Sequence, residues 1–271
     1  MFKSDHEGAH KIGDGQFAQS PKQEGWMAEK PLVATIVAPM KNEAANVRDL
    51  AREIGEACAA LGAFEAIFVD DGSDDDTAAQ IDAARSEFPW LRRVSHKKSC
   101  GQSTAVRTGV LHARAPIVLT LDGDGQNPPS QLPLIAKPLL EDERGEVGLV
   151  AGQRVGRRDT WSKRYASKAA NALRARLLDD DTRDTGCGLK AFRRDAFLAL
   201  PFFDHLHRYL PALFKREGWK IAHVDVAHRA RGYGTSHYTN FGRAIVGVID
   251  LIGVWWLLRR RKLPEITAVD E

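Results

Sequence analysis

From residue 31 onward, apolar residues follow two patterns that alternate along the chain. Short runs rich in β-branched residues predict buried strands at 32–38, 64–70, 91–95, 116–121 and 220–226. Segments with apolar residues at helical spacing predict helices at 44–61, 77–88, 102–113, 195–200 and 206–217. Because parallel strands are joined through crossover helices, the sequence predicts an α/β fold with a mainly parallel sheet and helices on both faces.

The two ends of the chain depart from this alternation. Residues 1–30 are polar and lack periodicity, and we expect a flexible leader there. Residues 31–238 are expected to form one domain, and residues 239–271 a C-terminal helix and tail. That helix is predicted over 241–262, where a hydrophobic run is interrupted by one acid and ends in the basic residues Arg259 to Lys262.

The composition narrows the class of protein. The chain has 39 Lys and Arg against 36 Asp and Glu, a net charge of +3 that does not suggest nucleic-acid binding. Its 3 cysteines lack C-x-x-C spacing, which supports neither a disulfide framework nor a cysteine zinc site and favours a reducing compartment. The N-terminal residues lack the apolar core of a secretory signal, and no uncharged run reaches the ~18 residues of a membrane span.

Carboxylates follow two of the predicted strands. Asp122 and Asp124 come directly after the fourth strand, and Asp70 and Asp71 stand at the end of the second. The carboxyl ends of parallel strands meet at one edge, so both pairs are expected to face one crevice. Such oxygen ligands suit Mg²⁺ or Mn²⁺, and Gln126 offers another oxygen. A solvated Asp-Gly turn after one strand and a helix-capping acidic run after the other are the alternatives.

Four motifs occur in the order expected for a known family, whereas neither G-x-G-x-x-G after the first strand nor a P-loop is present. They are Val37-Ala-Pro-Met-Lys-Asn-Glu43, Val69-Asp-Asp-Gly-Ser73, Asp122-Gly-Asp-Gly-Gln-Asn-Pro-Pro129 and Asp184-Thr-Gly-Cys-Gly188. Over roughly residues 32–240 the chain resembles family-2 glycosyltransferases, specifically their polyprenyl-phosphate branch, whose best-known member is dolichol-phosphate mannose synthase. The resemblance implies the GT-A fold, a three-layer α/β sandwich.

The same resemblance implies a reaction and the residues of the donor site. The reaction is an inverting, Mg²⁺- or Mn²⁺-dependent transfer of mannose or a similar hexose from a nucleotide-diphosphate sugar to a polyprenyl or dolichyl phosphate. By position, the base and ribose are held by Pro39, Glu43 and Asp71, with Asp122 near the ribose or diphosphate. The metal ligands implied in this way are Asp124 and Gln126. Asp122, Asp124 and Arg154 are the residues expected to carry catalysis.

Basic residues in the segment 152–176 supply an acceptor site in this interpretation. Arg154 stands where the branch has an arginine that meets the acceptor phosphate, and Lys163 and Ser167 match a second basic residue and a serine, with Arg164 competing with Lys163. Arginine suits bidentate phosphate contacts. A phosphate nucleophile is already anionic, so the reaction needs no general base. A solvated basic helix surface remains the alternative for this segment.

A glycine-rich segment near residue 235 resembles the late R-x-x-G-x-S-K-Y element of the branch. Arg231 and Ser236 match it, and His237 replaces the usual lysine. The resemblance implies a lid over the donor diphosphate, which the glycines would allow to move. An ordinary glycine-rich loop is the alternative.

The C-terminal helix is too short to span a bilayer. Residues 244–258 contain one charge, and at ~1.5 Å per residue they extend about 22 Å against a hydrocarbon core of about 30 Å. Trp255, Trp256 and the basic residues after them suit a membrane interface with anionic headgroups. We therefore expect a protein held peripherally at the cytoplasmic face of the membrane. A helix that packs in the core or in a dimer is the alternative.

Two further functions fit the same residues. A transferase of this fold could use a saccharide hydroxyl as acceptor in envelope polysaccharide synthesis, for which Asp184 is the candidate base. The chain could also be a catalytically silent protein that binds nucleotide sugars. The oligomeric state is left open by the sequence.

Overall fold

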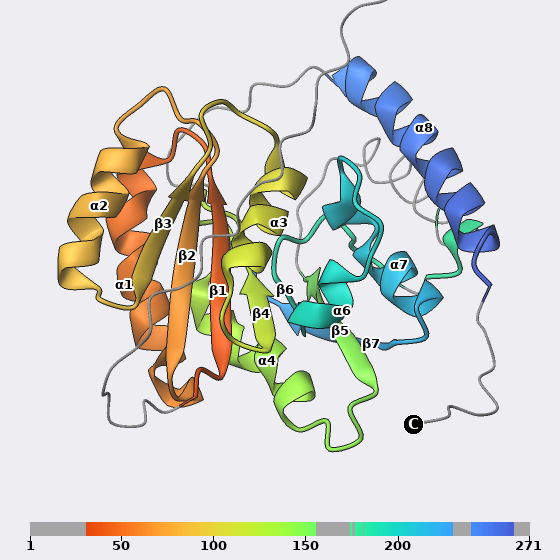
Figure 1. Ribbon diagram of the computed structural model, residues 1–271, viewed down its shortest axis with the longest axis horizontal. Helices are drawn as coiled ribbons and strands as arrows, with labels where there is room; N and C mark the ends of the chain where they lie inside the picture. The colour runs from red at the N-terminus through yellow and green to blue at the C-terminus, as the bar shows by residue number, and fades with distance from the viewer. Residues whose placement is uncertain (1–30, 156–173, 175–176, 181, 230–239, 263–271) are drawn as a thin grey trace, which may run out of the picture. The chain divides into compact units, whose positions relative to one another are not determined.

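Seven strands form one sheet in the order β3-β2-β1-β4-β6-β5-β7 (Figure 1). The computed structural model describes residues 31–155, 174, 177–180, 182–229 and 240–262. The strands are β1 (Ala34–Met40), β2 (Phe64–Asp70), β3 (Leu91–Ser95), β4 (Ile117–Thr120), β5 (Val147–Arg154), β6 (Lys190–Arg193) and β7 (Lys220–Val226). Among these described strands β6 alone is antiparallel to its neighbours, so the predicted mainly parallel sheet is confirmed.

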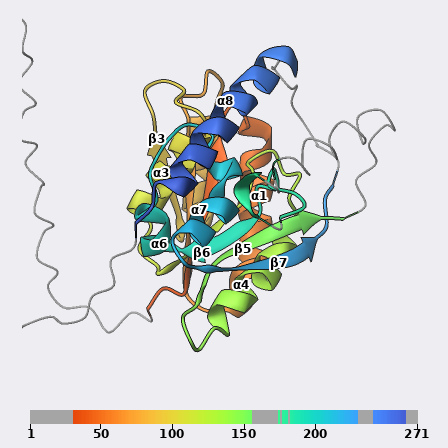
Figure 2. The ribbon, with the colours of Figure 1, turned by 90° about the vertical axis from the view of Figure 1, so that its right-hand side faces the viewer.

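Helices cover both faces of the sheet, as Figures 1 and 2 show. One face is covered by α1 (Val47–Cys58), α2 (Thr77–Glu87) and α4 (Leu132–Leu140). The other face is covered by α3 (Gln102–His112), α6 (Arg194–Leu198), α7 (Leu210–Arg216) and α8 (Asn240–Arg259). Alternate strand residues supply the two cores; Ile36 faces one and Val37 the other. The predicted three-layer α/β class is therefore confirmed.

The hydrophobic pattern located most elements of the first half and missed three elements beyond residue 130. The strands β1 to β4 and the helices α1 to α3 lie where they were predicted. Helix α4 was missed because Pro133 and Pro138 interrupt its pattern. Strand β5 contains two glycines and ends in polar residues, and β6 is only 4 residues long with a lysine at its start. Neither of these strands carries the long β-branched run that marks β1 and β2.

The sheet topology determines where functional residues can meet. Strands β1, β2, β4 and β5 run in the same direction, so their carboxyl ends lie along one edge of the sheet. Strand β6 runs the opposite way, and the loop that precedes it, residues 184–189, therefore enters at that same edge. The motifs found in the sequence follow β1, β2 and β4 or precede β6. They are thus brought to one edge by the fold.

At the opposite edge of the sheet, a buried carboxylate connects several strands. Glu65 near the start of β2 is 2% exposed. It accepts hydrogen bonds from Thr35 at 2.9 Å, from Arg92 at 2.8 Å, and from the backbone and side chain of Arg114 at 2.8 Å. Burial alone would raise the pKa of Glu65, but the bonds from Arg114, Arg92 and Thr35 outweigh it and hold that pKa below its usual range. This cluster joins β1, β2 and β3 to the segment before β4.

Helix α8 packs on the protein with one side and leaves an apolar side exposed. Val254 is 2% exposed, and Leu251 and Trp255 pack against the same core beside α7 (Figure 2). On the other side Ile249 and Ile252 are 63% and 59% exposed. Among the described residues, no helix combines the length and the apolar character needed to cross a membrane.

We predict that Glu65→Gln lowers the free energy of unfolding by about 1–3 kcal/mol at pH 7, because Arg92, Arg114 and Thr35 lose a buried, charged acceptor. The depressed pKa of Glu65 implies a stabilisation that is complete above its unfolded value, ~4.3, and is lost as the pH falls through the folded value. The cost of the substitution should therefore shrink below about pH 4. Urea unfolding of the wild type and the variant, at pH 7 and below about pH 4, measures this difference in the free energy of unfolding.

The matched control is Glu56→Gln on α1, which removes an exposed partner of Arg52. Exposed pairs of this kind contribute about 0–1 kcal/mol. Equal costs for the Glu65 and Glu56 variants at pH 7 would contradict the role assigned to Glu65.

Candidate functional site

The Asp122–Asp124 turn is pressed against the end of β1. Gly123 packs so closely on Pro39 and Met40 that a Cβ at this position would lie 2.7 Å from the carbonyl oxygen of Pro39 and overlap the sulfur of Met40. Only glycine fits there. The close approach places the carboxylates that follow β4 beside the end of β1, where Pro39 is half-buried and Met40 is buried.

Asp122 is held by neutral donors next to a second carboxylate. Its oxygens accept hydrogen bonds from Gln102 Nε2 at 2.7 Å and Asn127 Nδ2 at 2.9 Å. Burial raises the pKa of Asp122 and the charge of Asp124 raises it further, while Lys190 opposes both. Asp124 is 9% exposed and accepts the backbone N–H of Gln126 at 3.0 Å. Two like charges thus lie close together at a strand end, an arrangement that a cation would stabilise.

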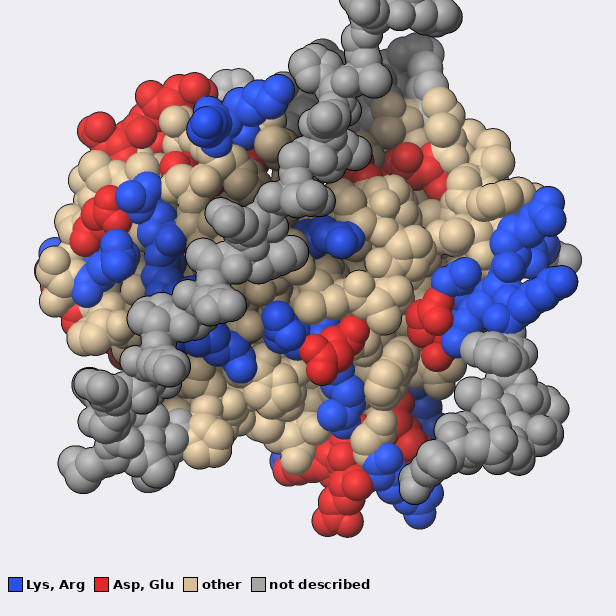
Figure 3. Space-filling view, in the orientation of Figure 1, with Lys and Arg blue, Asp and Glu red and all other residues tan. Residues whose placement is uncertain are grey.

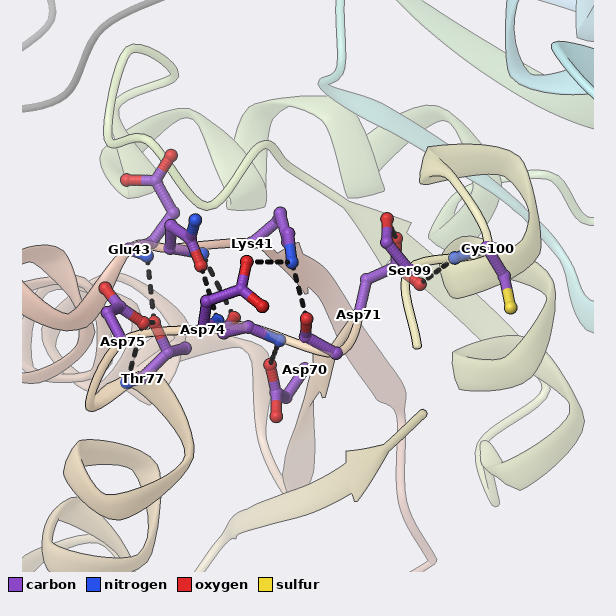
Figure 4. A network of polar contacts seen from close by, with 12 residues as sticks. Lys41, Glu43, Asp70, Asp71, Asp74, Asp75, Thr77, Ser99 and Cys100 are labelled. Carbon is purple, nitrogen blue, oxygen red and sulfur yellow. Dashed lines mark hydrogen bonds and ion pairs between the residues drawn. The ribbon is translucent and has the colours of Figure 1, made fainter. Parts of the chain in front are cut away.

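Asp71 is saturated by donors from the segment before α3. One oxygen contacts His96 Nδ1 at 2.7 Å and the backbone N–H of Cys100 at 2.8 Å; the other accepts bonds from Ser99 Oγ at 2.7 Å and Gly101 N at 2.9 Å. Figure 4 shows Asp71 directed toward Ser99 and Cys100. Burial would raise the pKa of Asp71, but these four bonds outweigh it and lower that pKa. The buried carboxylate therefore ties the end of β2 to the start of α3.

The acidic run after β2 folds back onto the segment after β1 (Figure 4). Lys41 Nζ donates to Asp74 at 3.0 Å and to the carbonyl of Gly72 at 2.5 Å. The backbone N–H of Glu43 donates to Thr77 Oγ1 at 2.9 Å. These bonds make a continuous rim from β1 to β2 that includes Glu43 and lies next to Asp71. The capping alternative also holds in part, because Asp75 accepts the N–H of Thr77 at 3.0 Å at the start of α2.

Arg154 and Asp184 form a bidentate ion pair on the other side of the Asp122 turn. Arg154 Nε and Nη2 lie 2.5 Å and 2.9 Å from the two carboxylate oxygens of Asp184. The backbone N–H of Asp184 donates to Gln153 Oε1 at 2.9 Å, so neighbouring residues of β5 hold Asp184 twice. The pair is largely buried, and its charges act on Asp122 and Lys190. The end of β5 is thereby joined to the loop before β6.

A cavity lies between Asp122, the start of α3 and the loop before β6. Its lining includes Pro39, Gln102, Asp122, Gly188, Lys190 and His207. Lys190 is buried at the start of β6, where its ammonium donates to the carbonyls of Cys187 and Thr185, and burial lowers its pKa. Gly188 packs so tightly on Asp122 that a Cβ there would overlap the carboxylate. The 184–189 loop therefore forms the wall of the cavity next to Asp122.

A family model for glycosyl transferase family 2 matches residues 35–200, more than half of the chain. The chain belongs to glycosyl transferase family 2. The matched range includes Arg154 and all four motifs, and the resemblance inferred from these motifs is confirmed.

Curated relatives and solved structures agree with this assignment to glycosyl transferase family 2. The undecaprenyl-phosphate 4-deoxy-4-formamido-L-arabinose transferase of Sodalis glossinidius (strain morsitans) is 34% identical over 208 residues, 76% of this chain and 62% of the relative. The transferase of the same name from Enterobacter sp. (strain 638) is 34% identical over 221 residues, 80% of this chain and 66% of the relative. The chain thus spans just under two thirds of the length of these relatives.

Two solved structures show the fold that this chain shares. Mannosyl-3-phosphoglycerate synthase from Rubrobacter xylanophilus has a TM-score of 0.64 at 19% identity, over 88% of this chain and 79% of its own. Glucosyl-3-phosphoglycerate synthase from Mycobacterium tuberculosis, solved with Mn²⁺, UDP and glucosyl-3-phosphoglycerate, has a TM-score of 0.62 at 23% identity, over 86% and 81%. At these identities the likeness concerns the fold.

The structure brings together the predicted site residues that it describes. Pro39, Asp122, Asp124 and Gln126 lie at the ends of β1 and β4, with Glu43 and Asp71 beside them and Arg154 at the end of β5. The remaining predicted residues lie outside the part of the chain that the structure describes: Lys163, Arg164, Ser167, Arg231, Ser236 and His237. Their roles stay predictions.

Two groups of residues could hold a divalent cation. The carboxylates of Asp122 and Asp124 are oxygen donors whose mutual repulsion is relieved by a cation, and they fit Mg²⁺ or Mn²⁺. Ligand atoms of Asp71, His96 and Cys100 also lie within 4.8 Å of one another. The oxygens of Asp71, however, already accept four hydrogen bonds, two of them from backbone N–H groups that cannot turn away. The Asp122–Asp124 turn is therefore the better cation site.

Sequence reasoning missed residues that support this turn from distant segments. Gln102 at the start of α3 donates to Asp122, and Arg229 after β7 contacts the carbonyl of Gly125 while its backbone N–H donates to Gln126 O at 3.0 Å. Arg229 is itself held by Glu53 of α1 at 3.0 Å. The sequence offered one signal for a further polar group at the site: Lys190 is a single charged residue between apolar neighbours.

We predict that Gly188→Ala destabilises the protein by about 1–3 kcal/mol, because the added methyl group must displace Asp122 or the β6 loop. Gly253→Ala on the exposed part of α8 meets no atom within 4 Å and is the control. The control should gain up to about 1 kcal/mol from helix propensity. Urea unfolding compares the two variants, and equal stability would contradict the tight packing of Gly188 on Asp122.

Proposed function

We propose that the chain is an inverting glycosyltransferase that moves a sugar from a nucleotide-diphosphate donor to a polyprenyl phosphate. The observation that carries the proposal is the position of Asp122 and Asp124 beside the end of β1 and of Arg154 two strands away, on one edge of the sheet. Asp122 of this carboxylate pair lines the cavity, and Arg154, which would bind the acceptor phosphate, pairs with Asp184 in the loop that forms one wall of the cavity. The names of the curated relatives, undecaprenyl-phosphate sugar transferases, support a lipid-phosphate acceptor.

On the donor side, the residues would bind and orient the nucleotide sugar. Pro39 and Glu43 border the place for base and ribose, with Asp71 shaping it from below, and Asp122 lies next to the diphosphate. Asp124, with Gln126 on the same turn, would hold Mg²⁺ or Mn²⁺. When bound, the cation supplies positive charge that stabilises the leaving diphosphate. The neutral amides of Gln102 and Asn127 keep Asp122 in place without competing for that charge.

On the acceptor side, Arg154 would orient the phosphate that attacks the sugar. An oxygen of the lipid phosphate forms the bond to the anomeric carbon as the bond from that carbon to the donor diphosphate breaks, which inverts the configuration. No proton has to be removed from this nucleophile, because a phosphate monoester is anionic near neutral pH. Lys163 or Arg164, and Ser167, are the further phosphate ligands that the sequence predicts.

A saccharide hydroxyl acceptor is disfavoured by the pairing of Asp184. Both oxygens of this candidate base face the guanidinium of Arg154 at 2.5 Å and 2.9 Å. Only the lone pairs that Arg154 leaves open could take a proton from a hydroxyl, whereas the guanidinium keeps further N–H donors for a phosphate. The identity of the donor sugar is a separate question. The candidates are mannose, another hexose, and an arabinose derivative like that in the relatives' names, and the panel of nucleotide sugars described below tests them.

The proposal predicts release of nucleoside diphosphate that requires both a divalent cation and a polyprenyl phosphate. The assay uses the full chain with Mn²⁺ or Mg²⁺, UDP- and GDP-sugars, and a short polyprenyl phosphate. Asp124→Asn should lower the rate at least about 100-fold, because a neutral amide would hold the cation more weakly, and the cation is the charge that would stabilise the leaving diphosphate.

Asp142→Asn is the control, since Asp142 pairs with Arg193 away from the cavity and should leave the rate unchanged. Release with oligosaccharide acceptors and none with lipid phosphate would replace the proposal by the saccharide transferase. Binding of nucleotide sugars without transfer to any acceptor would favour the catalytically silent protein.

We further propose that α8 holds the protein peripherally at the cytoplasmic face of a membrane. Its exposed side is apolar at Val248, Ile249, Ile252 and Trp256. Lys and Arg gather at its C-terminal end (Figure 3), where Arg259 stacks on Trp255 at 4.1 Å from the ring centroid. An apolar face bordered by tryptophan and basic residues suits a leaflet with anionic headgroups.

The double variant Ile249→Ser/Ile252→Ser should lose most of its binding to phosphatidylserine-containing liposomes, at least about tenfold in partition coefficient, because each isoleucine contributes roughly 1.5–3 kcal/mol when buried in lipid. Leu134→Ser/Leu140→Ser removes two leucines of α4 that are 45% and 44% exposed and is the control. Co-sedimentation measures both variants. Equal pelleting of the α8 variant and the wild type would exclude α8 as the membrane contact.

A further inference from the structure

The order of strands in the sheet also orders the parts of a bound donor. Asp71 follows β2, Pro39 lies at the end of β1, Asp122 follows β4, and Lys190 begins β6. Neighbouring strands lie about 4.8 Å apart. A nucleotide sugar whose nucleoside lies over β2 and β1, with its diphosphate at β4, therefore has its sugar over β4 and β6, which is where the cavity lies.

His207 enters this cavity from outside the sheet. It belongs to the short 3-10 helix Leu206–Arg208 that precedes α7. Its Nδ1 lies 2.7 Å from the hydroxyl oxygen of Ser103, a buried residue in the first turn of α3, and its own backbone N–H donates to the same oxygen at 3.3 Å. Two elements far apart in the chain thus fix the position of the imidazole ring.

The contacts of Ser103 also determine which ring nitrogen carries the hydrogen. The hydroxyl oxygen accepts the backbone N–H of His207, and its own hydrogen needs an acceptor because the group is buried. Within the described residues, the acceptor within hydrogen-bond distance of this hydroxyl group is His207 Nδ1. The neutral ring then carries its hydrogen on Nε2, the nitrogen opposite Ser103.

The imidazole stays neutral over the pH range of an enzyme assay. Burial lowers the pKa of His207 to about 3, and the charges of Lys190, Arg208 and His205 act in the same direction. His207 therefore presents an uncharged N–H donor rather than a cation. A cation in this position would attract phosphate, whereas a neutral donor suits a hydroxyl or carbonyl oxygen.

We propose that His207 is a specificity-determining residue of the donor site, whose Nε2–H donates a hydrogen bond to an oxygen substituent of the donor sugar. The inference rests on the proposed function, because it requires a nucleotide sugar in the site. The ligand of His207 is then a sugar with a hydroxyl or carbonyl oxygen that faces the start of α3 and residues 206–208. Ser103 is the residue that positions the ring.

Binding measurements separate this role from a role in nucleotide binding or folding. Calorimetry with Mn²⁺ compares UDP and GDP with UDP-glucose, UDP-L-arabinose and GDP-mannose on the full chain. For the sugar nucleotide that the wild type prefers, His207→Phe should weaken binding about tenfold, the value of one well-placed hydrogen bond. Binding of the parent nucleoside diphosphate should not change.

Two further variants keep the test independent of folding. His207→Gln retains an N–H donor and should bind the sugar nucleotide within about threefold of the wild type. His112→Phe on the exposed end of α3 is the matched control and should change neither affinity. A His207→Phe variant that loses the nucleoside diphosphate equally, or binds the sugar nucleotide as the wild type does, would overturn the assignment. A wild type that binds no nucleotide would overturn the proposed function as well.

Discussion

Two carboxylates that share the end of one buried strand are the constraint on which the site is built. Asp122 and Asp124 repel each other in a partly desolvated turn, so the fold has to supply neutral donors and a distant positive charge to hold them. Gln102 and Asn127 are the donors, and Lys190 below the turn is the charge. Glycines at 123 and 188 let two backbone segments close around the pair. Gln102 comes from α3, and Gly188 and Lys190 come from the segment at the start of β6, so the turn depends on contacts from two other elements of the fold.

The first half of this architecture could be predicted from the sequence, and the reason is physical. Strands β1, β2 and β4 are buried on both faces and are therefore mostly apolar, and the carboxylates at their carboxyl ends stand out by contrast. The parallel topology then requires that these ends meet. Nothing beyond hydrophobic pattern and strand direction is needed to place Asp71 and Asp122 on one edge.

The other wall of the site depends on contacts that no local pattern contains. His207 lies 104 positions from Ser103 in the sequence, and Arg229 contacts a turn that is equally distant. The sequence also predicted the role of Asp71 only in part. An acid at a strand end suggests a ligand, whereas its four hydrogen bonds show that it fastens β2 to α3. An apolar run at the C-terminus cannot indicate which side of the helix is covered, and only packing distinguishes Val254 from Ile252.

The attachment of α8 has a consequence for how the protein can be divided. Residues 205–210 supply His207 and Leu210 to the cavity, while His205 lies 2.8 Å from Asp250 and Tyr209 donates to the carbonyl of Gly247 at 3.4 Å, both on α8. A chain shortened to end before residue 240 would expose the apolar bed of Val254 and remove the support of the segment that carries His207. The helix thus supports the segment that carries His207, and a recombinant fragment without it would be an unreliable substitute for the full chain.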